Sequence, residues 1–391
     1  MSLCALPRLT ARATRLSNLR NCAAYSSQAA PTLATTKKKV IFSGIQPTGT
    51  PHIGNYLGAI RQWVRMQDEP RETTELLYSV VDLHAITVPI EANKLRQSKR
   101  ETMAALLAAG LDPERCTLFY QSSVPAHSEL MWILSCTASV GYLSRMTQWK
   151  ASCFLDSVVS SKLSLSSTAD VQDEKARSAL KLGLFSYPVL QAADILIYRA
   201  THVPVGDDQR QHLEFARECV TNFNSAYKSK ILVHPQSIIP PERRIMSLQS
   251  PTQKMSKSHA DPKSRILITD SPEAMHKKIM SSLTDSENSV SYDPEKRPGV
   301  SNLLDILSAF DGAERSPQEL AKSMAGESLK GLKTKTSEAV ISALDGMRER
   351  YLRVLEEDGG KYVDHVQEKS AEKARQRAAE TMHLIKTAVG L

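Results

Sequence analysis

The stretch KVIFSGIQPTGTPHIGNYLGA, residues 39–59, leads from an apolar run through a cluster of Gly, Pro and Thr into an amphipathic helical pattern. A chain that leaves a strand through glycines and enters a helix points the free N–H groups of that helix into the turn, which is how backbone forms a phosphate site. The spacing matches neither the dinucleotide G-x-G-x-x-G pattern nor the P-loop. The stretch therefore predicts a nucleotide cradle of a different kind.

Similar apolar runs and helical patterns alternate along the next part of the chain. The runs ELLYSVVD and CTLFYQS follow KVIFSGI, and helical patterns begin at Ile53, Asn93 and Ser128. This alternation predicts βαβ units and an α/β fold with a parallel sheet of Rossmann type. Ligands of such sheets bind at the carboxyl ends of the strands. Three segments fall at such ends: residues 44–55, VVDLHAIT around His84, and HVPVGDDQ at residues 202–209.

The strand signals stop near residue 270, and helical periodicity continues to the last residues. The chain of 391 residues is long enough for two domains. We therefore expect a Rossmann-type domain at residues 37–262 and an all-helical domain at residues 263–391. Residues 151–172 are rich in Ser and interrupt the alternation, which predicts a surface insertion.

The first acidic residue of the chain is Asp68, whereas the first twenty residues already hold four arginines among Ser, Ala and Leu. An acid-free, Arg-rich leader is typical of a mitochondrial presequence, and it predicts a presequence at residues 1–36 and a mature protein in the mitochondrial matrix. A disordered basic tail is the alternative. Removal of the leader lowers the formal net charge from +8 to 8 − 4 = +4, so overall charge does not argue for nucleic-acid binding.

Composition excludes several other classes of protein. No apolar run approaches the length of a membrane span, and 24% of the residues are charged, so we expect a soluble protein without a membrane partner. The six cysteines are scattered, with no C-x-x-C pair and no His at ligand spacing. Neither a zinc site nor a disulfide framework is indicated, and we expect no bound metal.

Four segments together carry a resemblance to a known family: PHIGN at 51–55, YPVLQAADILIY at 187–198, HVPVGDDQRQH at 202–212 and KMSKS at 254–258. The first and the last resemble the two nucleotide motifs of class I aminoacyl-tRNA synthetases. The segments SGIQPTGTPHIGNYLGA and QAADILIY are similar to the tryptophanyl branch in its bacterial and mitochondrial form. The resemblance extends from Val40 to the C-terminus, and it identifies the cradle as the loop and helix on which ATP lies.

The resemblance implies that the chain activates L-tryptophan with ATP to tryptophanyl-adenylate and transfers it to mitochondrial tRNA(Trp). The tryptophan carboxylate attacks the α-phosphate and expels pyrophosphate, so the reaction needs positioning and charge compensation but no general base. His52, Lys254 and Lys257 are the implied catalytic donors, with the backbone N–H groups of Gly54 and Asn55 under the nucleotide. Mg²⁺ is expected to arrive on the phosphates of ATP, because no carboxylate cage is apparent.

Two sets of site residues follow from the resemblance, position by position. Phe42, Val203 and Val205 could equally be strand core, and a lone His52 or His84 is more often a satisfied structural histidine. The implied ATP contacts are Gln46, Gly54, Asn55, Gly206, Asp207, Asp208, Ile245, Lys254, Met255, Ser256, Lys257 and Ser258. The implied tryptophan contacts are Phe42, Gly44, His84, Asp194, Val203, Val205 and Gln209.

Two positions depart from the family pattern. Gln191 stands where bacterial relatives often carry Met, and Ser152 stands where many relatives have a second Lys after the one matching Lys150. The departure at Ser152 leaves open whether another lysine, Lys162 or Lys175, acts on ATP in its place.

The resemblance also implies partners. A homodimer is expected, and the apolar helix SELMWILSCTASVGYL at residues 128–143 supports it. The helical domain is expected to bind the tRNA anticodon. Lys369, Lys373 and Arg377 recur every four residues and could meet tRNA phosphates or form a solvated helix face.

Two other functions remain possible from the sequence. A tyrosyl-type synthetase would share the fold and the chemistry, but would be expected to differ at GIQPTG and QAADIL. A catalytically inactive RNA-binding protein with a synthetase fold is opposed by the intact His52, Lys254 and Lys257.

Overall fold

The computed structural model describes residues 38–146, 181–206, 209–239, 244–257 and 259–391. The expected leader and the Ser-rich insertion lie outside these residues. So do three of the expected ATP contacts, Asp207, Asp208 and Ser258. The positions that bear on a second ATP-binding lysine also lie outside them: Lys150, Ser152, Lys162 and Lys175. Residues 38–391 form one compact unit. Within the described part of the chain, no helix is both long and apolar enough to cross a membrane.

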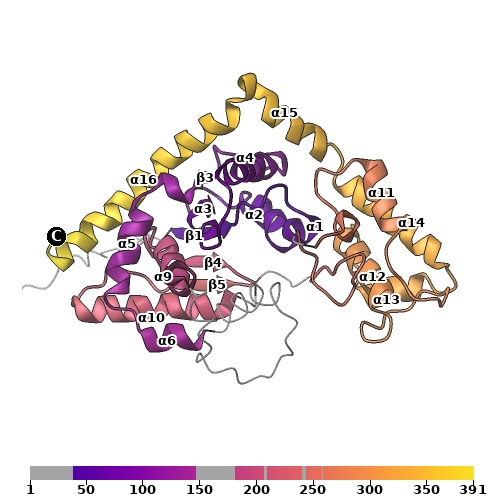
Figure 1. Ribbon diagram of the computed structural model, residues 1–391, viewed down its shortest axis with the longest axis horizontal. Coiled ribbons are helices and arrows are strands. Elements are labelled where there is room, and N and C mark those ends of the chain that lie inside the picture. Colours follow the sequence, from indigo (N-terminus) through magenta and orange to yellow (C-terminus); the bar gives the residue numbers. More distant parts are fainter. Residues whose placement is uncertain (1–37, 147–180, 207–208, 240–243, 258) are drawn as a thin grey trace, which may run out of the picture. The chain divides into compact units, whose positions relative to one another are not determined.

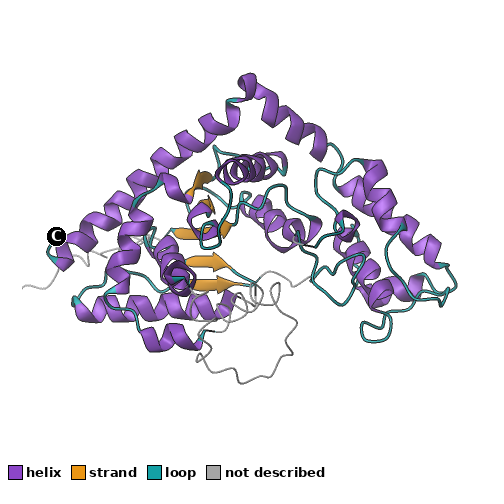
Figure 2. Cartoon of the chain, in the orientation of Figure 1, coloured by secondary structure: helices purple, strands orange, loops and turns teal. Residues whose placement is uncertain are grey.

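A five-stranded parallel sheet forms the centre of the molecule, which confirms the α/β fold predicted from the alternating runs (Figures 1 and 2). The strand order is β3-β2-β1-β4-β5, so the order reverses between β1 and β4. In sheets of this type, ligands bind in the crevice where the order reverses. The strands are β1 (Lys39–Ile45), β2 (Thr74–Val80), β3 (Thr117–Tyr120), β4 (His202–Pro204) and β5 (Gln236–Ile238).

The alternation of side chains along the strands divides the hydrophobic core into two clusters. On one side of the sheet, Ile41 and Tyr78 belong to a cluster with Trp63, whose ring stacks on Tyr78 at 4.6 Å between centroids. On the other side, Phe42 and Phe119 belong to a second cluster with Tyr198. Because both faces are covered, the strands read as nearly continuous apolar runs in the sequence.

Helices follow the strands as expected. The helix after β1 is a continuous series of α1 (Ile53–Asn55), a π-helical turn (Tyr56–Ile60) and α2 (Arg61–Met66). The short helices α3 (Asp82–Ala85) and η2 (Gln121–Ser123) lie at the carboxyl ends of β2 and β3. The others are α4 (Ala92–Ala108), α5 (Ala126–Ser135), α6 (Val140–Arg145), α9 (Leu182–Leu196) and α10 (Arg210–Ala226).

The second half of the chain is helical after residue 270, as predicted. Ser271, Ser316 and Ser328 each accept a backbone hydrogen bond at the start of a helix, which satisfies one of the free N–H groups there. The helices are α11 (Pro272–Met280), α12 (Pro298–Phe310), α13 (Pro317–Ser323), α14 (Leu329–Ala343), α15 (Met347–Gly360) and α16 (Tyr362–Val389).

The last two helices return to the sheet. Helix α15 packs against α4, and α16 packs against β3 and α5 (Figure 1). Between them Asp358, Gly359 and Gly360 have positive φ, which bends the chain. The buried alanines Ala371 and Ala374 place α16 in the same cluster as Phe119. Residues 263–391 therefore contribute to the core around the sheet, and the boundary at residue 262 stays a prediction.

The basic stripe on α16 is largely paired with carboxylates. Lys369 contacts Glu114 at 2.7 Å, and Arg377 contacts Glu380 at 2.9 Å and Glu75 at 3.5 Å. These pairs are at least partly exposed, where an ion pair contributes little stability and phosphate can compete for it. Two of the three basic residues of the stripe, Lys369 and Arg377, are thus paired with carboxylates in this structure.

Candidate active site

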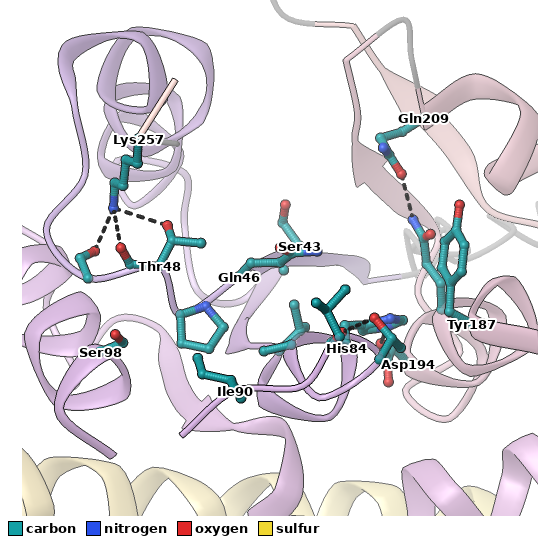
Figure 3. Close-up of a pocket in the computed structure, with 18 of the residues that line it drawn as sticks. Ser43, Gln46, Thr48, His84, Ile90, Ser98, Tyr187, Asp194, Gln209 and Lys257 are labelled. Atoms are coloured by element: carbon teal, nitrogen blue, oxygen red, sulfur yellow. Dashed lines mark hydrogen bonds and ion pairs between the residues drawn. The ribbon is translucent and has the colours of Figure 1, made fainter. Parts of the chain in front are cut away.

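A cavity of about 1130 Å³ opens at the carboxyl ends of β1 and β4, where the strand order reverses (Figure 3). The structure brings the whole set of expected tryptophan contacts into its wall, together with two of the expected ATP contacts. These residues are Phe42, Gly44, His84, Asp194, Val203, Val205 and Gln209, with Gln46 and Lys257.

The other described ATP contacts do not line this cavity. Ile245 and Met255 are buried in the cluster around Trp63, and Lys254 is exposed. The remaining residues outside the lining are His52, Gly54, Asn55, Gly206 and Ser256. The residues expected to bind tryptophan therefore lie together in one cavity, whereas most of those expected to bind ATP do not line it, and both roles stay predictions.

His52 caps the helix that begins the cradle. Its Nδ1 accepts hydrogen bonds from the N–H groups of Gly54 at 3.1 Å and Asn55 at 3.3 Å, and Asn55 Oδ1 accepts from the His52 N–H at 3.2 Å. A Cβ on Gly54 would lie 2.9 Å from His52 Cε1, so only glycine fits at this close approach. The two N–H groups expected to lie free under the nucleotide are thus bound to His52, which differs from the prediction.

The charge state of His52 follows from this cap. Burial, together with the nearby cations Lys257, Lys254 and Arg265, lowers the pKa of His52 to about 4. His52 is therefore neutral near pH 7, with Nδ1 accepting and the proton on Nε2. It is a neutral hydrogen-bond donor and not a cation.

Lys257 is held against the turn that follows β1 (Figure 3). Its Nζ donates to the Thr48 carbonyl at 3.1 Å, the Thr48 hydroxyl at 3.0 Å and the Gly49 carbonyl at 2.8 Å. Burial lowers the pKa of Lys257 to about 8. The ammonium lies at the cavity wall and is satisfied by backbone oxygens, which a phosphate group would have to replace.

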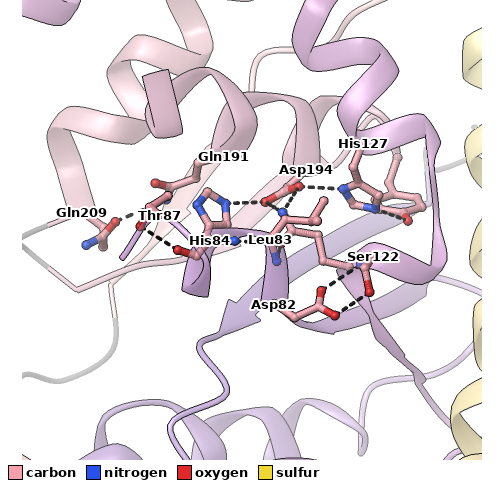
Figure 4. A network of polar contacts seen from close by, with 11 residues as sticks. Asp82, Leu83, His84, Thr87, Ser122, His127, Gln191, Asp194 and Gln209 are labelled. Atoms are coloured by element: carbon pink, nitrogen blue, oxygen red, sulfur yellow. Dashed lines mark hydrogen bonds and ion pairs between the residues drawn. The ribbon is translucent and has the colours of Figure 1, made fainter. Parts of the chain in front are cut away.

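Asp194 is the buried carboxylate of the cavity (Figure 4). Its oxygens accept hydrogen bonds from His84 Nε2 at 2.9 Å, His127 Nδ1 at 2.6 Å, and Gln121 Nε2 at 2.7 and 2.9 Å. Burial by itself would raise the pKa of Asp194, but the hydrogen bonds from His127 and His84 lower it to about 2. Asp194 is therefore a fixed carboxylate anion, the natural partner of a donor with no acceptor function.

Sequence reasoning missed Gln121, His127 and Tyr198. Gln121 follows β3 directly, and its Oε1 accepts from the N–H of Leu83 at 3.0 Å, so it joins the ends of β2 and β3 to Asp194. Its position directly after a strand could have marked Gln121 as a site residue, because ligands bind at the carboxyl ends of parallel strands. His127 Nε2 lies 2.8 Å from Tyr198 Oη, and both side chains are fully buried. A lone histidine in an apolar helix gives no such signal.

The mouth of the cavity carries uncharged polar groups. Gln191 Nε2 donates to Gln209 Oε1 at 3.3 Å, so the residue that departs from the bacterial pattern lies in the cavity wall (Figure 4). Tyr187 Oη is 2.7 Å from His212 Nε2, and its ring meets His84 edge to face at 6.2 Å. These amide and hydroxyl groups suit the ammonium and carboxylate groups of an amino acid.

No metal-binding cluster of His, Cys, Asp or Glu occurs among the residues that the structure describes.

The parallel sheet with a cavity at the reversal of strand order, and the lysine held against the turn after β1, agree with the four sequence motifs that resemble class I synthetases. The chain belongs to this class: residues 34–345 match the family tRNA synthetases class I (W and Y).

Three of the similar proteins are tryptophan enzymes. The chain is 43% identical to the mitochondrial tryptophan–tRNA ligase of Schizosaccharomyces pombe, over 90% of this chain and 95% of that protein. It is 41% identical to the tryptophan–tRNA ligase of Caldanaerobacter subterraneus, over 90% and 98%. The crystal structure of tryptophanyl-tRNA synthetase from Campylobacter jejuni, complexed with ADP and tryptophan, matches with a TM-score of 0.69 and 32% identity, over 90% of this chain and all of that one.

Proposed function

We propose that this protein is an ATP-dependent tryptophan–tRNA ligase, which forms tryptophanyl-adenylate and pyrophosphate and then charges tRNA(Trp). The observation that carries the proposal is the buried, ionised Asp194 in the wall of the cavity at the carboxyl ends of β1 and β4. Indole N–H donates and never accepts, so a fixed carboxylate suits it, whereas a phenylalanine ring offers no donor. The similarity to tryptophan–tRNA ligases over most of the chain supports the same substrate.

The chemistry follows from the charges around the cradle. The tryptophan carboxylate attacks the α-phosphate, a P–O bond forms, and the bond to the pyrophosphate leaving group breaks. Negative charge grows on the leaving group, so nearby cations and donors act on the transition state more than on the ground state. Lys257 and Lys254 supply positive charge and His52 supplies a neutral Nε2–H. We propose that Mg²⁺ enters on the phosphates of ATP, because the described residues hold no acidic cage for it.

Exchange of labelled pyrophosphate into ATP, tested with each of the twenty amino acids, examines this function directly. We expect exchange that depends on tryptophan. Exchange with tyrosine would indicate a tyrosyl-type enzyme, and a folded protein without exchange would indicate an inactive RNA-binding protein.

We propose that the mature protein works in the mitochondrial matrix after removal of the leader at residues 1–36. One relative is a mitochondrial enzyme, and a bacterial one is about equally similar, so the Arg-rich leader is the argument that favours the organelle. Sequencing the N-terminus of protein isolated from mitochondria tests it. A chain that still begins with Met1 would contradict import with cleavage.

We propose that residues 263–391 bind the anticodon arm of the tRNA. The helices α11, α12 and α13 are joined by contacts with one another and with α14, whereas α15 packs on α4 and α16 packs on β3 and α5. Binding of tRNA(Trp) in increasing salt would measure how many lysines and arginines neutralise phosphates.

A further inference from the structure

All acceptor positions of the Asp194 carboxylate are engaged in the empty site. Oδ1 accepts from His127 Nδ1 at 2.6 Å and Gln121 Nε2 at 2.7 Å. Oδ2 accepts from His84 Nε2 and Gln121 Nε2, each at 2.9 Å. A carboxylate offers about four lone-pair positions, so a further donor can bind Asp194 well only if a present one withdraws.

The three donors are not equally placed (Figure 4). His84 lines the cavity together with Asp194, whereas Gln121 and His127 do not line it and are fully buried. Gln121 is also fixed through its Oε1, which accepts from the backbone N–H of Leu83 at 3.0 Å. A ligand in the cavity therefore meets His84, and the other two donors lie behind the carboxylate.

Both ring nitrogens of His127 form hydrogen bonds, one with Asp194 and the other with Tyr198. Since the Asp194 carboxylate can only accept, His127 donates through Nδ1, and its Nε2 forms a hydrogen bond with Tyr198 Oη at 2.8 Å. Burial keeps the pKa of Tyr198 well above its usual range, so the hydroxyl retains its proton. Tyr198 is itself held, because its ring stacks on Phe42 at 5.7 Å and meets Phe119 edge to face at 5.8 Å.

We propose that His127 and Tyr198 are positioning residues for amino-acid choice, and that His84 is the exchangeable partner of Asp194. The hydrogen bonds that join Tyr198, His127 and Oδ1 hold the carboxylate in one orientation, in which Oδ2 contacts His84, a residue of the cavity wall. The indole N–H of the substrate takes the place of the His84 Nε2–H on Oδ2. This assignment rests on the proposed function, because it explains how the same site selects an N–H donor.

Selectivity then depends on an exchange of hydrogen bonds and not on shape alone. A ring of the same shape without N–H cannot replace His84 on Oδ2, so it gains nothing from displacing that donor. When the hydrogen bond from His127 is lost or weakened, Gln121 remains as the only firm donor to Oδ1, so the carboxylate is less well oriented and an N–H-bearing substrate loses a well-placed acceptor. An analogue without N–H loses nothing by the same change.

The variant Tyr198→Phe tests the assignment by removing one buried hydroxyl. Pyrophosphate exchange is measured with tryptophan and with the analogue that carries sulfur in place of the indole N–H. We expect the KM for tryptophan to rise by about tenfold, because the bond that weakens in the complex joins the indole N–H to a charged carboxylate. The kcat, the KM for ATP and the KM for the analogue should stay within about twofold.

Tyr78→Phe is the matched control, because Tyr78 is equally buried and its hydroxyl, 3.4 Å from the Trp63 carbonyl, lies outside the cavity wall. This control should leave the preference for tryptophan unchanged. Equal rises in KM for tryptophan and for the analogue in Tyr198→Phe would overturn the assignment, because they indicate a general loosening of the pocket.

Two variants at His127 give an independent test. His127→Asn keeps an N–H donor near Asp194, whereas His127→Leu removes it. We expect the asparagine variant to retain more of the preference for tryptophan than the leucine variant, and equal losses would contradict the assignment. Tryptophan-dependent exchange by the unmodified protein tests the proposed function. If that exchange is present but the two His127 variants lose the preference for tryptophan equally, only the positioning role fails.

Discussion

We expect amino-acid choice to depend most on Asp194, the buried carboxylate in the cavity wall. We expect Asp194→Ala to weaken tryptophan activation by roughly 2 to 4 kcal/mol, the range for loss of a charged hydrogen bond in a buried site. Discrimination against phenylalanine should fall by a similar factor, and the KM for ATP should change little. Pyrophosphate exchange with both amino acids measures this.

The same substitution leaves His84, Gln121 and His127 without their shared acceptor, so the variant also loses stability. Asp194→Asn keeps the size of the side chain and limits that effect. Equal losses for tryptophan and phenylalanine in both variants would mean that Asp194 acts on the fold and not on substrate choice.

His52 also makes the stability of the folded protein depend on pH. Its pKa is about 4 in the folded protein, below the ordinary 6.5, because burial and nearby cations disfavour the charged ring. The unfolded chain therefore binds this proton first as the pH falls. The stability that the neutral cap contributes is complete above about pH 6.5 and is lost progressively toward pH 4.

The variant His52→Asn keeps a capping side chain that does not titrate. Between neutral pH and about pH 5, its free energy of unfolding should fall less than that of the unmodified protein, by on the order of 2 kcal/mol. Urea unfolding at the two pH values measures the difference. Parallel losses in both proteins would show that His52 does not titrate on unfolding.

At the scale of elements, the loop 254–258 is bound to the turn after β1 through Lys257. Because the pKa of Lys257 is about 8 in the unliganded protein, its charge is present below that pH and lost above it. We expect kcat/KM for ATP to fall as the pH rises through about 8, since this ratio reports the free enzyme. Lys257→Ala should lower the activation rate by ~10²-fold and remove the inflection.

Lys254 provides the matched control for this loop, because it is exposed and does not line the cavity. Lys254→Ala should also lower the rate by ~10²-fold but retain the inflection near pH 8. An unchanged pH profile in Lys257→Ala would contradict the role of its titration.

Local patterns explain why the elements of the sheet could be predicted. Runs such as KVIFSGI are β-rich, bounded by turn residues and buried on both faces, and these properties are visible in a single segment. The packing of α16 against β3 depends on contacts far apart in the sequence, and alternating charges on α16 resemble any solvated helix. The same limit applies to the site, since the meeting of His127 with Asp194 depends on how α5 packs against α9.

At the scale of the whole molecule, the exposed apolar surface of α5 and α6 bears on assembly. Trp132 is 73% exposed and Val140 is 68% exposed, large fractions for apolar side chains. With the family resemblance, this surface leads us to propose a homodimer. Trp132→Glu should shift the protein from dimer to monomer in light scattering at low micromolar concentration, because it places a charge in the interface.

Leu352→Glu is the control for that experiment, because Leu352 is also an exposed apolar residue, on α15, outside the proposed surface. It should leave the mass unchanged. A monomeric unmodified protein with full activity would remove the proposal.

The return of α16 to the sheet has a consequence for how the molecule is made. Gln367 donates to the Ser123 hydroxyl at 2.8 Å and Arg375 to the Ser123 carbonyl at 3.1 Å, across 244 and 252 positions of sequence. Synthesis delivers the chain from its N-terminus, so β3 emerges long before the helix that covers it. Until then Phe119 lacks its cover and an aggregation-prone apolar surface stays open. A chaperone that binds exposed apolar segments therefore has its longest opportunity at β3.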